Sequence, residues 1–448
     1  MDARALDGLY AEHVAALRVR LDAVLATEGW DAIAIHAGSL ARRSRFDDQS
    51  WPLRVSPPFQ HWLPLAEAEC ALVLRPGYRP TLLRPATTSF WEKPSPPESA
   101  AFEEFFDVLE VREIDAFVRA HLGPGRVAFV GEDPARAAAW GLDGTAACPP
   151  GLVLALERLR STKTQYEVAC LAEANRRAAA GHEALRQAFA AGDASELDLH
   201  LLFLKATLQD DSETPYKNIV ALGAHAATLH HVAYARLTES RASESLLVDA
   251  GATCRGYGSD VTRTWVKGGG AAASTFAHLI ASVEAMQRRL CASVGVGTPY
   301  ESLHDESHRQ MGAILRDVGL IRGSAEEAVA AGVTRAFFPH GLGHSLGLQT
   351  HDVGCALRAP RAENAFLRNT SDVAVGQVFT IEPGVYFIDE LLAELRAHRT
   401  AAALVEWKMV DAIAPLGGVR IEDDLHVEAD AVRNLTREHL PLGGGRVS

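Results

Sequence analysis

Runs of apolar residues differ in length and spacing between the first third of the chain and the remainder. Charged and apolar positions mix at helical spacing over residues 3–27, and three short apolar runs typical of strands follow. These runs are DAIAIH (31–36), CALVL (70–74) and VAFVG (127–131), and a turn cluster follows at 148–151. We therefore predict a smaller mixed α/β domain over residues 1–155.

The pattern changes after residue 155. Apolar positions at helical spacing predict long helices at about 164–190, 195–209, 274–294 and 300–319. Segments with strand character lie between and after these helices, which is an α+β arrangement. We predict that residues 156–448 form a second, larger α+β domain.

Five ionisable residues in this second part each lie inside an apolar segment flanked by glycine. They are Asp249, Asp260, His344, Glu382 and Glu422, in segments 246–265, 337–354, 379–387 and 417–424. Burying a carboxylate is costly unless it is paired or bound to a cation. A single Asp at a strand end is usually a turn former, and a lone His in a glycine-rich loop usually bonds the backbone. The five together favour a two-metal site instead.

The segment 246–265 predicts a hairpin that carries two of these carboxylates. An apolar run ends in Asp249, glycines at 251, 256 and 258 permit a reversal, and the chain returns through Asp260 in an alternating strand. We expect Asp249 and Asp260 to face each other across this ladder. Two like charges in that position destabilise a hairpin by roughly 0.2–1 kcal/mol, and a metal between them would reverse the effect.

The other three residues complete an oxygen-rich ligand set. Glu382 and Glu422 each follow a short segment that is typical of a buried strand, and His344 lies in a glycine-rich loop that lets the backbone approach a ligand. None of the six cysteines forms a CxxC pair, so the oxygen-rich set favours Mn, Co or Zn over a thiolate-bound metal. We expect Mn first, with Co or Zn as alternatives. Two divalent ions would balance four carboxylates, and such pairs lie about 3.5–4 Å apart with an activated water between them.

These motifs resemble the proline-specific metallopeptidases of the pita-bread fold, and among them the bacterial Xaa-Pro dipeptidases, or prolidases. The resemblance rests on the order Asp, Asp, His, Glu, Glu, with eleven residues from Asp249 to Asp260 and seven from His344 to His351. Segments 47–65, 159–178 and 214–231 are similar to prolidase sequence as well. The resemblance covers nearly the whole chain and implies a pita-bread catalytic domain after a creatinase-type N-terminal domain.

The resemblance also implies roles for individual residues. The five ligand residues would bind the two metals, with Asp260 and Glu422 bridging them. Glu382 would also act as general base toward a metal-bridging hydroxide, and His351 would stabilise the tetrahedral intermediate. The remaining pocket residues would be His230, His340, Arg420, Tyr216 and Tyr300, with His230 close to the reaction. Arg420 could grip a free carboxylate with two hydrogen bonds, which would favour a substrate that ends at the proline.

The chain departs from the family at one position and has one further candidate. The family usually has Leu-His-Tyr where this chain has Leu229, His230 and His231, so we expect His231 in the substrate pocket beside the metals. The resemblance implies a homodimer, in which a proline-rich loop at 85–97 with Phe90 and Trp91 reaches the partner's active site. Phe90 and Trp91 could instead anchor their own loop.

Composition is typical of a soluble cytoplasmic enzyme. The formal net charge of −13 argues against nucleic acid or an anionic membrane as a partner. Six cysteines at irregular positions fit a reducing compartment, and the sequence has neither a signal peptide nor an apolar run of about 18 residues. We expect a cytoplasmic enzyme that acts on small peptides.

Three alternatives stay open from sequence. An Xaa-Pro aminopeptidase acting on longer peptides would share every metal ligand. A non-catalytic pita-bread module that binds peptides is a second alternative, although such relatives typically lose the ligand set. Arg420 could also form a structural salt bridge with Asp423 or Asp424 rather than bind substrate.

Overall fold

The computed structural model describes residues 3–86, 97, 99–192, 194–237 and 244–447. It consists of two compact units, Met1–Cys170 and Leu171–Ser448. The expected boundary between residues 155 and 156 would fall inside a helix, α5 (Pro150–Ser161). The Phe90–Trp91 loop lies outside the described residues.

The first unit is built on a five-stranded mixed sheet with strand order β4-β3-β2-β1-β5. Strand β1 pairs antiparallel with β2 and parallel with β5, and β3 pairs antiparallel with β2 and parallel with β4. The strands are β1 (Ala32–His36), β2 (Ala71–Leu74), β3 (Thr81–Pro85), β4 (Asp107–Val111) and β5 (Val127–Val130). The three predicted strands correspond to β1, β2 and β5, and the mixed α/β class is confirmed.

Helices and short turns complete this unit. They are α1 (Ala3–Glu28), α2 (Pro57–Gln60), η1 (Ala101–Phe105), α3 (Ile114–His121), α4 (Ala135–Ala139), η2 (Gly144–Ala146) and α5. Apolar side chains of the sheet pack on Val118 and Leu122 at α3 and on Trp140 after α4, which gives this unit a core of its own.

The second unit contains several small sheets. A four-stranded sheet has the order β16-β10-β7-β6, a three-stranded sheet has the order β11-β14-β15, and β12 pairs with β13 and β8 with β9. The bounds are β6 (Ile219–Leu222), β7 (Ser245–Asp249), β8 (Thr253–Cys254), β9 (Tyr257–Gly258), β10 (Thr262–Val266), β11 (Val378–Ile381), β12 (Gly384–Tyr386), β13 (Gly418–Arg420), β14 (Asp423–Val427), β15 (Val432–Asn434) and β16 (Gly444–Arg446). A single bridge between Thr262 and Glu422 joins the first two sheets.

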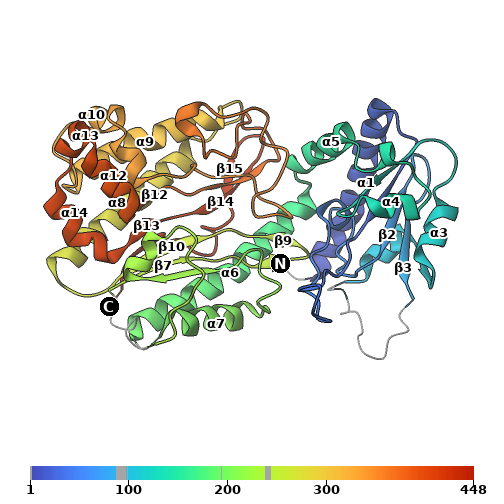
Figure 1. Cartoon of the computed structure of the whole chain (residues 1–448), viewed down its shortest axis with the longest axis horizontal. Coiled ribbons are helices and arrows are strands. Elements are labelled where there is room, and N and C mark those ends of the chain that lie inside the picture. Colours follow the sequence, from blue (N-terminus) through green and yellow to red (C-terminus); the bar gives the residue numbers. More distant parts are fainter. Residues whose placement is uncertain (1–2, 87–96, 98, 193, 238–243, 448) are drawn as a thin grey trace. The chain divides into compact units, whose positions relative to one another are not determined.

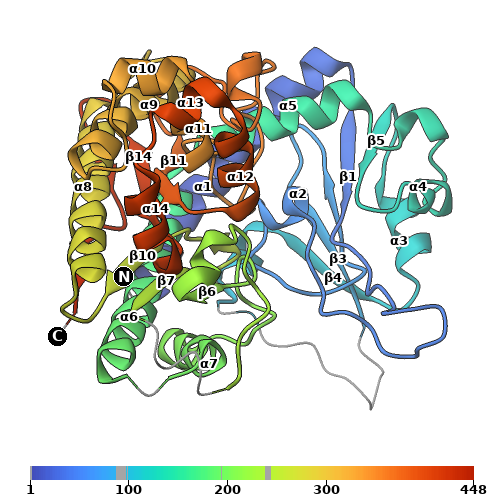
Figure 2. The same cartoon turned by 60° about the vertical axis from the view of Figure 1, so that its left-hand side comes forward.

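Two layers of helices enclose these strands. One layer is formed by α6 (Gln165–Ala191) and α7 (Glu196–Thr207), whose apolar faces pack on β6, β7 and β10. The other includes α8 (Ala271–Ser293) and α9 (Tyr300–Asp317), which pack with β11, β13 and β14 (Figures 1 and 2). The four long helices predicted from sequence are therefore present, and the strands between the layers carry the site.

Shorter helices surround this arrangement. They are η3 (Gly223–Ala227), α10 (Ala325–Ala330), α11 (Val333–Phe337), η5 (Ala362–Asn364), α12 (Asp389–Ala397), α13 (Arg399–Ala403), α14 (Trp407–Ile413) and η6 (Ala414–Leu416). None of the helices within the described ranges is both long enough and apolar enough to cross a membrane.

Candidate active site

The five predicted ligand residues, four at or near strand ends and His344 in a loop, converge on one cavity of about 480 Å³. Asp249 ends β7, Asp260 precedes β10, Glu382 follows β11, and Glu422 lies between β13 and β14. All five line the cavity wall. Strand ends from three sheets therefore bring together residues that are far apart in sequence.

His344 lies among these carboxylates. Its Nε2 atom is 3.3 Å from Asp260 Oδ2, 3.7 Å from Glu382 Oε1 and 4.0 Å from Glu422 Oε1. Ligand atoms of Asp260, His344 and Glu422 all lie within 4.8 Å of one another. This spacing suits side chains that share a cation.

The hairpin that carries the two aspartates has a different register from the one expected. Asp249 pairs with Thr262, not with Asp260, so the expected direct opposition is wrong. The reversal contains the additional short hairpin β8–β9, whose turn has Arg255 and Gly256 at φ values of 51° and 90°. Asp260 stands two residues before Thr262, so it lies diagonally across from Asp249.

Backbone and side-chain hydrogen bonds fix the orientation of His344. Its Nδ1 donates to the carbonyl oxygen of Ser345 at 3.1 Å, which leaves Nε2 to face the carboxylates. Thr380 holds the loop beside β11, because its N–H donates to the His344 carbonyl and its hydroxyl accepts from the His344 N–H. At Gly343 a Cβ atom would lie 2.2 Å from the Thr380 carbonyl oxygen, so only glycine permits this approach.

Glu422 is attached to β10 in a similar way. Its N–H donates to the Thr262 carbonyl at 3.1 Å, and the Thr262 hydroxyl donates to Glu422 Oε2 at 2.7 Å. Thr262 therefore attaches Glu422 to β10, the strand that follows a second predicted ligand, Asp260.

The crowding of negative charge in a buried site alters how these groups titrate. Burial and the charges of Asp260, Glu382 and Asp249 raise the pKa of Glu422 well above its ordinary range. Burial raises the pKa of Glu382 to about 7, although His344 and Arg420 partly offset it. Burial opposes protonation of His344, but Asp260 and Glu382 raise its pKa to about 9. The site thus attracts positive charge.

These residues fit the binding of divalent cations. Asp249 Oδ1 is buried and has no hydrogen-bond partner among the described residues. The side chains of Asp249, Asp260 and Glu422 are at most 12% exposed, so water cannot fully solvate them. A cation would satisfy both the orphaned oxygen and the excess negative charge.

Arg420 contacts Asp249, a carboxylate that was predicted as a metal ligand but not as the partner of Arg420. Its NH2 donates to Asp249 Oδ2 at 2.6 Å, its NH1 to the Tyr386 hydroxyl at 2.8 Å and its Nε to Thr262 Oγ1 at 3.1 Å. The alternative of a salt bridge to Asp423 or Asp424 is therefore wrong. Because Tyr386 also shares a hydrogen bond of 2.8 Å with His340 Nε2, one polar chain runs from His340 to Asp249.

Four of the other predicted residues line the cavity, and Tyr216 is buried near it. His230, His340, His351 and Arg420 line the cavity with the five ligand residues. Tyr216 is buried, and burial together with the charges of Asp249, Asp260 and Glu422 raises its pKa well above its ordinary range. Its hydroxyl therefore stays protonated.

Like Tyr216, the predicted pocket residues Tyr300 and His231 do not line this cavity. The Tyr300 hydroxyl donates to the Thr380 carbonyl at 2.7 Å, so it supports the strand behind the site. His231 turns away from the carboxylates because its Nε2 donates to Glu196 at 2.8 Å. The expectation that His231 lies beside the metals is corrected accordingly, and Trp91 lies outside the described residues.

Sequence reasoning missed several residues that contribute to the site. Tyr386, Thr262 and Thr380 hold predicted site residues in place, and Arg368 lines the cavity. A polar residue in an otherwise apolar strand was the available signal for the two threonines. Arg368 gave no signal because it is an exposed arginine in a segment without regular secondary structure.

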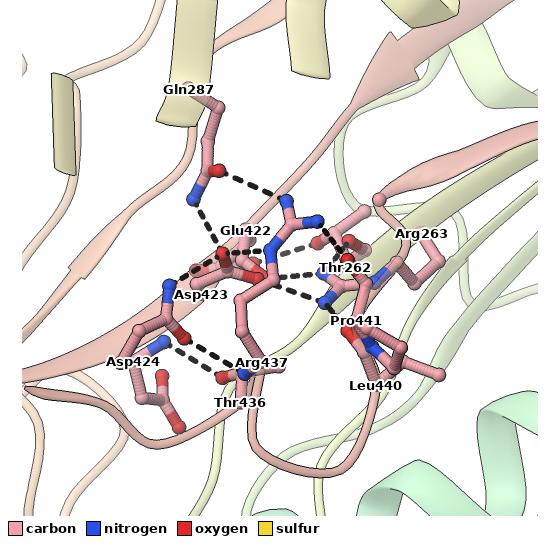
Figure 3. Close-up of polar contacts among 12 residues, drawn as sticks. Thr262, Arg263, Gln287, Glu422, Asp423, Asp424, Thr436, Arg437, Leu440 and Pro441 are labelled. Carbon is pink, nitrogen blue, oxygen red and sulfur yellow. Dashed lines mark hydrogen bonds and ion pairs between the residues drawn. The ribbon is translucent and has the colours of Figure 1, made fainter. Parts of the chain in front are cut away.

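Behind the site, Asp423 and Asp424 take part in a buried polar network (Figure 3). Arg263 donates to the carbonyl oxygens of Thr262 and Glu422 and to Asp423 Oδ1. Asp424 Oδ2 accepts from the N–H of Asp260 at 3.1 Å. The two acids next to Glu422 therefore fix the backbone that carries two predicted ligands.

Comparisons with known proteins agree with this geometry. Residues 169–429 match metallopeptidase family M24, and residues 8–157 match the N-terminal domain of Xaa-Pro dipeptidases. The Xaa-Pro dipeptidase of Marinobacter nauticus is 41% identical over 436 residues, which cover 96% of this chain and 98% of that relative. The Xaa-Pro dipeptidase of Pseudoalteromonas atlantica is 38% identical over 440 residues, covering 96% and 98%.

Solved structures show the same fold. Pseudomonas aeruginosa aminopeptidase PepP aligns with a TM-score of 0.72 at 22% identity, covering 97% of this chain and 95% of that chain. A zinc-substituted Escherichia coli aminopeptidase P aligns with a TM-score of 0.72 over 96% of this chain and 95% of that one, also at 22% identity. The resemblance inferred from the motifs is confirmed, and the chain belongs to metallopeptidase family M24.

Proposed function

We propose that this protein is a metal-dependent Xaa-Pro dipeptidase, which hydrolyses dipeptides with a C-terminal proline. The observation that carries the proposal is the convergence of four carboxylates and one imidazole on a single cavity. Relatives named Xaa-Pro dipeptidase cover nearly the whole chain, which supports the substrate class.

The five residues Asp249, Asp260, His344, Glu382 and Glu422 would hold two divalent ions. Such ions polarise a scissile carbonyl and make water acidic enough to attack it at neutral pH. Manganese suits this oxygen-rich set, with cobalt or zinc as alternatives.

The remaining cavity residues have roles that follow from where they lie. Glu382 faces the cavity, so we propose that it holds and transfers the proton during hydrolysis. His230, His340 and His351 would contact the peptide or the developing charge on its carbonyl oxygen, as imidazole N–H groups can do. Tyr216 would support the ligands from behind the cavity, since its buried hydroxyl lies near their charges.

Arg420 and Arg368 are the arginines on the cavity wall. Arg420 already donates to Asp249, Tyr386 and Thr262, so we propose that it acts mainly by holding Asp249. Arg368 is exposed, and no described residue forms a hydrogen bond or ion pair with its guanidinium. We propose that Arg368 takes the free carboxylate of the substrate.

Arg368→Ala should distinguish a free acid from an amide. Loss of a charge-assisted hydrogen bond costs roughly 1.5–3 kcal/mol, so kcat/KM for Ala-Pro should fall about 10- to 100-fold. The value for Ala-Pro amide, which parent enzyme should already cleave poorly, should change little. Arg399→Ala, at an exposed arginine of α13, serves as the control.

Equal losses for acid and amide would exclude this role for Arg368. Equal parent rates on Xaa-Pro and on Xaa-Pro-Zaa tripeptides would favour the aminopeptidase alternative.

The assembly and location are also proposals. We propose a homodimer in which the Trp91 loop of one chain contributes to the partner's substrate site, which rests on the family resemblance alone. A cytoplasmic location is supported by six cysteines at irregular positions.

Trp91→Ala should raise KM for Ala-Pro several-fold without altering metal content, because water would be excluded less well from the site. Sedimentation of the parent protein should give twice the chain mass of 48.2 kDa. A monomer with full activity would contradict both statements.

A further inference from the structure

The segment between β6 and β7 brings Leu229 and His230 to the wall of the cavity. The His230 side chain is exposed and forms no hydrogen bond or ion pair with any described residue. Its position therefore depends on how the backbone on either side is held.

Glu196, the first residue of α7, contacts this segment at four points. Its Oε1 accepts from the N–H of Leu222 at 2.9 Å and from His225 Nδ1 at 2.7 Å. Its Oε2 accepts from His231 Nε2 at 2.8 Å and from the N–H of Ala235 at 2.7 Å. One side chain, 0% exposed, thus connects both ends and the middle of residues 222–235.

Glu196 is itself well fixed. A capping box formed by Ser195 and Asp198 starts α7 at this point, so the backbone that carries Glu196 is ordered by its own hydrogen bonds. Although burial disfavours a charge, the hydrogen bonds from His231, Ala235, Leu222 and His225 lower the pKa of Glu196 to about 2. The carboxylate is therefore ionised and accepts strong hydrogen bonds.

The two histidines on Glu196 stack on each other, with ring centroids 4.5 Å apart and an interplanar angle of 22°. These three side chains are of the types that bind metals. However, each oxygen of Glu196 already accepts two N–H donors, so hydrogen bonding accounts for the arrangement without an ion.

The tip of the segment has few other attachments. No backbone hydrogen bond joins residues 229–233 to any other described part of the chain. Leu229 packs against an apolar cluster that includes Ile219, Ala221 and Tyr386, and His231 donates a hydrogen bond to Glu196. His230 therefore stands between one apolar anchor and one polar anchor.

We propose that Glu196 is a positioning residue that acts through His231 and the flanking backbone to present His230 to the substrate. The proposal deepens the proposed peptidase function and rests on it. In this proposal His231 holds the backbone next to His230 and does not itself bind the substrate.

A double-mutant cycle with His230 tests the proposal. Glu196→Gln keeps the shape of the side chain but replaces one acceptor oxygen by a donor, and misplacement of His230 should lower kcat/KM for Ala-Pro about tenfold. The same change in a His230→Ala background should have no further effect, because the two residues act as one unit. Additive losses would overturn the proposal.

Substitutions at His231 provide a second variant if Glu196→Gln folds poorly. His231→Phe keeps a ring but removes the hydrogen bond, and should lower kcat/KM as Glu196→Gln does. His231→Tyr keeps a donor and should retain most of the parent activity. Equal activity of the Phe and Tyr variants would overturn the role of this hydrogen bond.

Hydrogen exchange separates failure of this proposal from failure of the peptidase function. Glu196→Gln should speed amide exchange in residues 222–235 whether or not the protein cleaves Xaa-Pro, while metal content stays at the parent value. Glu183→Gln, at a partly exposed carboxylate of α6, should leave exchange in this segment and activity unchanged. Unchanged exchange in Glu196→Gln would overturn the proposal.

Discussion

Asp260→Asn should lower kcat/KM for Ala-Pro by about a thousandfold or more, which corresponds to about 4 kcal/mol of transition-state stabilisation. Asp260 Oδ2 lies 3.3 Å from His344 Nε2, and Asp260 lines the cavity together with Glu422 and Glu382. The neutral amide is a weaker ligand for divalent cations than a carboxylate is, so metal content should fall as well.

The fold should survive this substitution because the Asp260 backbone N–H still donates to Asp424. The circular dichroism spectrum and the urea unfolding midpoint of the metal-free variant should match those of the metal-free parent. Asp430→Asn, at an exposed aspartate outside the cavity, should keep full activity and metal content. An Asp260→Asn variant with parent activity at parent metal content would remove Asp260 from the proposed ligand set.

Asp423→Ala should lower the free energy of unfolding by about 3–5 kcal/mol, because it leaves the buried Arg263 without its ion-pair partner. Asp423 accepts from Arg263, Gln287, Asn434 and Arg437, and the side chain of Arg263 is 0% exposed (Figure 3). Urea unfolding of the metal-free proteins gives the comparison, so that lost metal binding does not contribute.

The stabilising effect of Asp423 should depend on pH in a defined direction. Burial opposes the charge, but Arg263 and Arg437 lower the pKa of Asp423 from 3.8 to about 2. A carboxyl with a lowered folded-state pKa stabilises the folded protein above its ordinary pKa, and this contribution disappears as the pH falls toward 2.

Asp372→Ala is the matched control for Asp423→Ala, since the Asp372 side chain is 63% exposed and lies 3.9 Å from Arg358. Such a surface pair contributes about 0–1 kcal/mol. Equal destabilisation by the two substitutions would mean that the buried network does not hold the folded backbone as described.

The metal-ligand candidates could be predicted because a charge inside an apolar segment is a local signal. Asp249, Glu382 and Glu422 each follow a short, mainly apolar segment, and the structure places all of them at strand ends around one cavity. The strand register was less accessible. The additional β8–β9 hairpin places Asp260 diagonally across from Asp249. Its turn needs positive φ angles at Arg255 and Gly256, and arginine rarely adopts such an angle.

Side-chain partners across long sequence separations could not be predicted. Arg420 and Asp249 are 171 residues apart, and only the packing of β13 beside β7 and β10 brings them together. Likewise, nothing local to His231 indicates that a glutamate at the start of α7 will accept its hydrogen bond. Which partner Arg420 or His231 contacts is decided by how distant segments pack in the folded core.

The most direct test of the two-metal peptidase proposal is to titrate metal-free protein with manganese and to measure the rate of proline release from Ala-Pro at each step. We expect no turnover without metal and a rise in rate that reaches a plateau at two ions per chain. A full rate of proline release from protein shown to be free of metal would contradict the proposal.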